Sequence, residues 1–427
     1  MSAIVIFGVL LVLMLTGMPI SISLGLTVLT FLFTMTQVPL ESVALKLFSG
    51  IEKFEIMAIP FFILAGNFLT HGGVARRMID FAASMVGHWY GGLALAGVMA
   101  CALFAAVSGS SPATVVAIGS ILLPGMIKAG FPMKFGAGVI TTSGALGILI
   151  PPSIVMVMYS VATNTSVGAL FMAGVIPGLI LATMLGGITW YRAMKFDYPR
   201  QPKASWLERL RTFRKAVWGL MLIIVVMGGI YSGVFTPTEA AAMSAVYAFF
   251  VSVFVYKDLT LKDVPKVLLS SANMSAMLLY IITNAVMFSF ILANENIPQL
   301  LTDWLIDKGL GQIAFLFAVN ILLLMAGNFM EPSSIMLIFA PIVFPVAMKL
   351  GIDPVHLGIL MTVNMEVGMC HPPVGLNLYV ASGLTKMGIT ELTVAVWPWL
   401  LTMLVFLIGV TYWPTMSIWL PKALGMM

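Results

Sequence analysis

The stretch that decides the fold is Gly147-Ile-Leu-Ile-Pro-Pro-Ser153, and its helix-breaking residues recur in Gly368-Met-Cys-His-Pro-Pro373. The offset in numbering is 368 − 147 = 221 for the glycines and 372 − 151 = 221 for the first prolines. Both stretches interrupt long apolar segments. An interruption inside a membrane helix leaves backbone carbonyls and amides that lipid cannot satisfy, so they must line a cavity enclosed by protein. The pair therefore predicts two discontinuous membrane helices.

Further landmarks recur at nearly the same offset along the chain. They are Pro112 and Pro332 (offset 220), Gly130 and Gly351 (221), Pro177 and Pro398 (221), and Pro19 and Pro237 (218). Gly and Pro are frequent in membrane helices, so a single match would carry little weight. Six matches near one offset predict an internal repeat. We take residues 1–215 as repeat one and 216–427 as repeat two.

The composition predicts an all-α integral membrane protein. Hydrophobic residues make up 60% of the 427 and charged residues 9%, and the mean hydropathy is +1.07. Soluble domains carry about 25% charged residues. Apolar runs of about 20 residues recur, each long enough to cross roughly 30 Å of hydrocarbon as a helix.

A basic segment at 192–215 predicts the orientation of the chain. It holds eight of the 21 Lys and Arg residues, and a short basic loop between apolar runs is typical of the cytoplasmic side. This clustering also argues against nucleic-acid binding. Assigning membrane crossings in both directions from this loop gives about ten spans and two re-entrant helical hairpins, one at 91–128 and one at 311–349. Five crossings in each half invert the second copy, so hairpin one enters from the cytoplasm and hairpin two from the periplasm.

Two amphipathic stretches, 40–46 and 261–266, are predicted as arm helices that lie flat on opposite membrane faces. The remaining spans and these arms would form a static frame.

The hairpin tips and the breaks predict about two Na⁺ sites. Small cations prefer hard oxygen ligands, and the C-terminal ends of helices carry partial negative charge. Hydroxyl and carbonyl oxygens of each tip face the break of the same half. The predicted ligands are Ser108, Ser110, Gly147 and Pro151 in half one, and Gly327, Asn328, Met330, Gly368 and Pro372, with Phe329 beside them, in half two.

The half-helices that follow the breaks predict an anion site. They begin at Ser153 and at Val374 to Asn377, and unpaired amides at a helix N-terminus attract carboxylates. Few Lys or Arg lie at bilayer depth, so helix dipoles, hydroxyls and bound cations would hold an anionic substrate. We predict Ser111, Ser153 and Asn377 as substrate contacts. The alternative role for any of these side chains is packing between helices.

Three titratable residues lie inside apolar segments, where charge is usually functional. Glu331 and Glu366 could carry coupling protons or approach a cation site, whereas Glu331 could also simply face water at the hairpin tip. His371 lies within the second break and is predicted as a hydrogen-bonded imidazole, because no partner stands at metal-ligand spacing.

Two other classes of protein fit the sequence less well. An intramembrane hydrolase could use Ser110 or Ser111 with His88 or His371, but no HExxH or GxSxG motif is present. A purely structural subunit would leave the two broken helices without a purpose. The sequence therefore favours a transporter that is not an enzyme, and the missing GxxxxGK[ST] motif agrees with a driving force other than ATP.

Five segments together resemble the large membrane subunit of the tripartite ATP-independent periplasmic (TRAP) transporters. They are Phe61–Asn67, Ser108–Thr114, Gly147–Ser153, Phe235–Ala241 and Pro372–Asn377. The resemblance implies an elevator-type secondary transporter in the bacterial inner membrane, driven by Na⁺, for organic acids such as sialic acid or C4-dicarboxylates. In such a transporter, the two hairpins and the two broken helices would form a transport unit that slides against the static frame. It also implies two partners, a small four-helix membrane subunit and a periplasmic substrate-binding protein. Since the chain starts directly in an apolar span, we expect the small subunit to be a separate chain.

A stand-alone Na⁺/dicarboxylate symporter, or an ion antiporter of related inverted-repeat build, is the alternative. Uptake without any soluble binding protein would favour that alternative.

Overall fold

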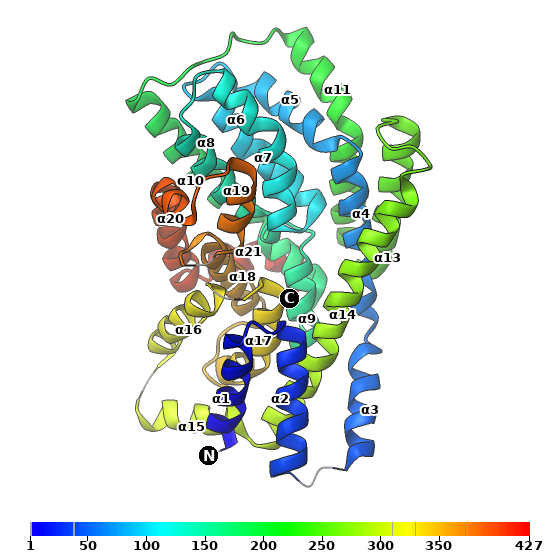
Figure 1. Ribbon diagram of the computed structural model, residues 1–427, viewed down its shortest axis with the longest axis vertical. Coiled ribbons are helices and arrows are strands. Elements are labelled where there is room, and N and C mark those ends of the chain that lie inside the picture. Colours follow the sequence, from blue (N-terminus) through cyan, green and yellow to red (C-terminus); the bar gives the residue numbers. More distant parts are fainter. Residues whose placement is uncertain (1, 37–38, 310, 329, 374) are drawn as a thin grey trace.

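The computed structural model describes residues 2–36, 39–309, 311–328, 330–373 and 375–427, and these residues form a bundle of helices (Figure 1). Within those ranges no strand occurs, and eight helices are long and apolar enough to cross a membrane. These are Phe54–His71, Ser111–Lys128, Val167–Lys195, Trp206–Tyr231, Pro237–Val255, Val264–Asn294, Pro332–Lys349 and Ile389–Tyr412. The predicted all-α membrane fold is confirmed.

The first half contains the elements α1 (Ser2–Leu15), α2 (Ile20–Met35), α3 (Leu40–Ile51), η1 (Phe54–Met57), α4 (Ala58–His71), α5 (Val74–Val86), α6 (Gly92–Ser108), α7 (Ser111–Lys128), α8 (Met133–Ser143), η2 (Gly144–Ile148), α9 (Ile154–Thr163) and α10 (Val167–Lys195). The second half contains α11 (Trp206–Ile223), η3 (Ile224–Gly228), α12 (Gly229–Tyr231), α13 (Pro237–Phe250), η4 (Val251–Val255), α14 (Val264–Asn294), α15 (Ile297–Asp307), α16 (Gln312–Gly327), α17 (Pro332–Lys349), α18 (Pro354–Cys370), α19 (Leu376–Thr385), α20 (Ile389–Tyr412) and α21 (Thr415–Ala423). The elements η3 and η4 are single π-helical turns.

Each segment predicted as a hairpin contains two packed helices. Helices α6 and α7 lie in the upper half of the molecule, and α16 and α17 lie in the lower half (Figure 1). Gly109 and Ser110 form the turn between α6 and α7, and Gly109 adopts a left-handed φ of +60°. The membrane side from which each hairpin enters and the repeat boundary at 215 and 216 stay predictions.

The two predicted helix breaks are confirmed. The helical turn η2 ends at Ile148 before α9 begins, and α18 ends at Cys370 before α19 begins. Proline has no N–H group, so Pro151 and Pro152 cannot donate to the carbonyls of the residues four positions earlier. The carbonyls of Gly147 and Ile148 thereby lose their helical partners.

The half-helices are exchanged between the two halves of the chain. Helix α9 of the first half packs on α17, and α19 of the second half packs on α7. Each half-helix thus contacts the hairpin of the other half. This exchange brings segments that are distant in the sequence to the same place.

The prediction of a loop over the whole of 192–215 is wrong. Helix α10 continues to Lys195 and α11 already begins at Trp206. The Ser205 hydroxyl accepts a hydrogen bond of 3.2 Å from the amide of Glu208, so Ser205 caps the helix. Because a Ser followed three residues later by Glu is a helix-start signal, the sequence contained the information for this boundary.

The prediction of two arm helices is half right. Helix α3 is a separate helix, but Val264 and Lys266 belong to the first turn of α14, a continuous helix of 31 residues. No Gly or Pro follows Pro265 until the helix ends at Asn294, so nothing interrupts it. Whether α3 lies flat on a membrane face stays a prediction.

Candidate functional site

The tip of hairpin one lies inside the first break. A Cβ atom on Gly147 would lie 2.6 Å from the Ser110 carbonyl oxygen, and one on Gly109 would lie 2.8 Å from the Pro152 carbonyl oxygen. Both distances are shorter than a Cβ atom tolerates, so only glycine fits at these two positions without a shift of the backbone. The hairpin backbone therefore contacts both flanks of the interruption, as the prediction of facing elements requires.

Three oxygens at this tip already have partners within the hairpin. The Ser108 hydroxyl pairs with the Thr114 hydroxyl at 2.9 Å, and the Ser110 carbonyl accepts from the Thr114 hydroxyl at 2.8 Å. The Ser110 hydroxyl and the carbonyls of Gly147 and Ile148, which Pro151 and Pro152 leave without helical donors, are further ligand candidates. The ligand roles of Ser108, Ser110, Gly147 and Pro151 stay predictions.

The second tip repeats this close approach. A Cβ atom on Gly327 would lie 2.9 Å from the Gly368 Cα, and the reverse distance is also 2.9 Å. The Asn328 side-chain oxygen is 2.9 Å from Nδ1 of His371, which confirms the hydrogen-bonded imidazole. The Met330 amide donates to the Ala326 carbonyl at 3.1 Å. Phe329 and Val374, both named in the sequence predictions, lie outside the described residues.

Two of the predicted substrate residues are in direct contact. The Asn377 amide nitrogen donates to the Ser111 hydroxyl at 2.7 Å and to the Thr141 carbonyl at 3.3 Å. The side chains of Ser111 and Asn377 are fully buried. Ser153 has a different place, because its hydroxyl caps α9 by accepting from the Met156 amide at 3.4 Å. Sequence reasoning did not predict the Thr141 contact, since any residue can supply a carbonyl.

Several buried oxygens have no hydrogen-bond partner among the described residues. They are both carboxylate oxygens of Glu366, the side-chain oxygen of Asn364 and the hydroxyl of Ser143. Asn364 and Ser143 differ in position by 364 − 143 = 221, which is the repeat offset. Applying this offset to polar residues would have found the pair from the sequence.

Unpaired oxygens and free carbonyls are the kind of hard ligand that small cations prefer, and a Na⁺ site built from them stays a prediction. In the described part of the chain, no group of three His, Cys, Asp or Glu residues could hold a metal ion. Glu331 is partly buried and accepts hydrogen bonds from the hydroxyls of Ser333 at 2.6 Å and Ser334 at 3.3 Å. The Glu331 carboxylate at the second tip is therefore hydrogen-bonded to two side chains in the first turn of α17.

Lys53 lies in the segment between α3 and η1, and its side chain contacts the end of α9. Its ammonium group donates to the Val161 carbonyl at 2.5 Å and to the Asn164 side-chain oxygen at 2.8 Å. The sequence offered no signal for this contact, because Lys53 stands alone in a connecting segment. The contact ties the predicted frame to the predicted transport unit.

Paired interruptions in two halves of a membrane protein, each facing a hairpin tip, define a transporter fold of the discontinuous-helix class. The chain belongs to the tripartite ATP-independent periplasmic transporter family, DctM component, whose family model matches residues 7–416. It is a transporter permease component rather than an enzyme. It is also a multi-pass protein of the inner membrane.

Known proteins of similar sequence carry related names. The chain is 76% identical over 440 residues to the C4-dicarboxylate TRAP transporter large permease protein of Rhodobacter capsulatus, covering 100% of both chains. It is 55% identical over 404 residues to the protein of that name from Pseudomonas aeruginosa, covering 95% of each chain. The solved YdaH transporter of Alcanivorax borkumensis shares the fold, with a TM-score of 0.61, 16% identity and coverage of 89% of this chain and 90% of that one.

Proposed function

We propose that this chain is the transport subunit of a TRAP system that imports a C4-dicarboxylate across the inner membrane together with Na⁺. Its partners would be a small four-helix membrane subunit and a periplasmic binding protein that delivers the substrate. The C4-dicarboxylate names of both relatives support this substrate class over sialic acid.

The charge distribution supports cation coupling. The hairpins and broken helices fall in four segments, 78–127, 135–191, 309–348 and 350–385, that contain no Lys or Arg. Moving a dianion into such a region without compensation costs several kcal/mol per charge. Two Na⁺ ions held by the tips and breaks would neutralise both carboxylates, and the complex could then cross at a small electrostatic cost.

The observation that carries the proposal is the hydrogen bond between Ser111 and Asn377. It joins hairpin one to the second half-helix, so it lies where both halves of the chain meet. The start of α19 offers unpaired amides and a positive helix end to a carboxylate. Cation binding at the tips would assemble this pocket, and the loaded transport unit would then slide against the frame in an elevator-type motion.

The experiment is uptake of labelled succinate into proteoliposomes that contain this chain, its small subunit and its binding protein. We expect uptake under an inward Na⁺ gradient and none when choline replaces Na⁺ at a fixed proton gradient. Equal uptake in choline would reject Na⁺ coupling. Uptake without the binding protein would support the stand-alone symporter instead.

Hairpin one can be tested directly with a double variant. Replacing the hydroxyls in Ser108→Ala with Ser110→Ala should raise the Na⁺ concentration needed for half-maximal uptake. Ser120→Ala, an exposed position on α7 of the same hairpin, is the matched control. An unchanged Na⁺ dependence in the folded double variant would remove these hydroxyls from the coupling site.

A further inference from the structure

A basic pocket lies where α5 and α11 meet the end of the π-helical turn η4, on the side that the positive-inside rule assigns to the cytoplasm. The pocket has a volume of about 390 Å³, and its lining includes Arg76, Arg77, Asp80, Arg214, Lys215 and Trp218. We propose that it binds the phosphate group of an anionic phospholipid of the cytoplasmic leaflet.

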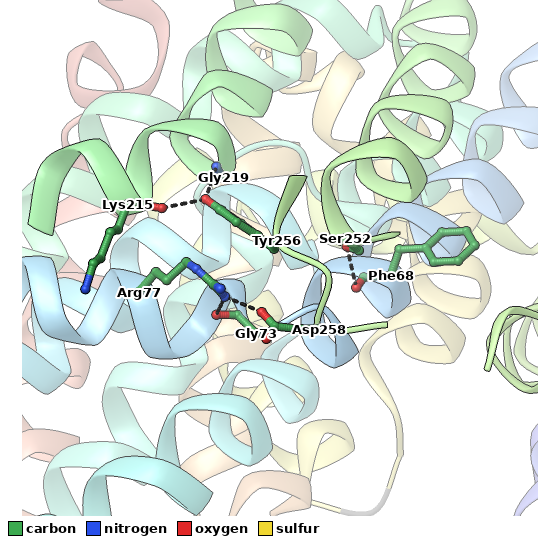
Figure 2. Close-up of polar contacts among 8 residues, drawn as sticks. All are labelled: Phe68, Gly73, Arg77, Lys215, Gly219, Ser252, Tyr256 and Asp258. Carbon is green, nitrogen blue, oxygen red and sulfur yellow. Dashed lines mark hydrogen bonds and ion pairs between the residues drawn. The ribbon is translucent and has the colours of Figure 1, made fainter. Parts of the chain in front are cut away.

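One wall of the pocket is held in place by polar contacts (Figure 2). The Tyr256 hydroxyl donates to the Lys215 carbonyl at 2.7 Å and accepts from the Gly219 amide at 3.2 Å. The Arg77 guanidinium lies 3.9 Å from the centre of the Tyr256 ring and pairs with the Asp258 carboxylate. Arg77 is therefore part of a fixed wall, and Asp258 offsets its charge.

The remaining charge in the pocket is positive. Arg76, Arg214 and Lys215 are exposed and form no ion pair with the residues that the structure describes, and Asp80 is the one carboxylate among the lining residues. Three positive charges and one negative charge leave a net charge of 3 − 1 = +2. A guanidinium group presents a fork of N–H donors that matches the oxygens of a phosphate. A phosphodiester with one negative charge fits this set.

Apolar side chains beside the pocket favour a lipid over a soluble anion. On α11, Trp218 and Met221 are 45% and 38% exposed, and they follow Arg214 and Lys215 in the direction of the apolar span. The same helix continues into an apolar span that ends at Tyr231. Tryptophan is enriched at the membrane interface, where its ring lies at headgroup depth. An acyl chain would cover this apolar surface, whereas free phosphate would contact only the charges.

The test uses the delipidated full chain in detergent, titrated with phosphatidylglycerol (PG) and, separately, with phosphatidylethanolamine. We expect PG to raise the melting temperature and to be retained in native mass spectrometry, and phosphatidylethanolamine to do neither. Arg76→Gln with Arg214→Gln should weaken PG binding at least tenfold. Lys128→Gln removes an exposed charge from the same predicted side outside the pocket and should bind PG like the wild type.

Three results would overturn the proposal. They are an equal response to both lipids, a folded double variant that binds PG as tightly as the wild type, and a melting-temperature rise with inorganic phosphate that matches the rise with PG. The last result would assign the pocket to a soluble anion. Should the double variant fail to fold, Arg214→Gln alone replaces it, and unchanged PG retention in that variant would equally reject the site.

Discussion

The contact between Gly147 and the tip of hairpin one leads to a prediction about Gly147→Ala. The added Cβ would lie 2.6 Å from the Ser110 carbonyl oxygen, 2.7 Å from the Ser110 carbonyl carbon and 2.8 Å from the Ser111 Cα. All three atoms belong to the backbone, which cannot turn away as a side chain can. An ordinary contact begins near 3.4 Å, so the tip must move by 3.4 − 2.6 = 0.8 Å.

The expected cost follows from this overlap. Overpacking a close contact costs about 1–3 kcal/mol, and each 1.4 kcal/mol corresponds to a factor of ten in an equilibrium constant. If the tip and the break jointly hold a cation, the Na⁺ concentration for half-maximal succinate uptake should rise by about 5- to 150-fold. Displacement of Ser111 should also weaken substrate binding, because Ser111 contacts Asn377.

The assay is succinate uptake by proteoliposomes over a series of Na⁺ concentrations. Gly187→Ala is the matched control, because a Cβ atom there meets nothing within 4 Å. We expect this control to keep the wild-type Na⁺ dependence. A folded Gly147→Ala protein with the same Na⁺ dependence as the control would refute the idea that tip and break form one cation site.

Three further predictions follow from the described contacts. Asn377→Ala leaves the buried Ser111 hydroxyl without its partner, which costs about 1–3 kcal/mol. The succinate concentration for half-maximal uptake should therefore rise at least fivefold. An unchanged value would place the substrate elsewhere. Lys53→Met removes both hydrogen bonds to the end of α9, so amide hydrogen exchange there should become faster, and an unaltered rate would show that the contact does not stabilise α9. Partial burial raises the pKa of the Asp80 carboxyl, although the charges of Lys215, Arg76 and Arg77 oppose this shift. Protonation of Asp80 as the pH falls through that pKa removes a negative charge from the basic pocket, so PG binding should strengthen on acidification. The Asp80→Asn variant should bind PG more tightly at pH 7, and its PG binding should no longer depend on pH.

The breaks and hairpin helices could be predicted closely because their signals are local. Clustered glycines and prolines interrupt a helix, so the break near Pro151 and the hairpin over 91–128 follow from a few neighbouring residues. A single proline such as Pro177 stays inside its helix. The fusion of the second predicted arm into α14 was missed, although the absence of breakers after Pro265 was visible in the sequence. Short helices such as α5 and α15 were missed because their apolar runs are brief.

The candidate site was predicted as a set of residues, but its internal contacts were not. Ser111 and Asn377 were each predicted as substrate contacts from their places beside a tip and a break. Their hydrogen bond depends on the packing of α19 against α7, which no local pattern contains. The same reason applies to Lys53, whose partners are distant in the sequence.

The exchange of α9 and α19 between hairpins has a consequence for biogenesis. Helix α9 begins at Ile154, and its packing partner α17 begins only at Pro332, a difference in position of 332 − 154 = 178. At about 5–20 residues per second, a newly inserted α9 waits roughly 10–35 s for that partner. If the gene were severed between its halves, neither polypeptide could pack its half-helix against a hairpin until it met the other in the bilayer.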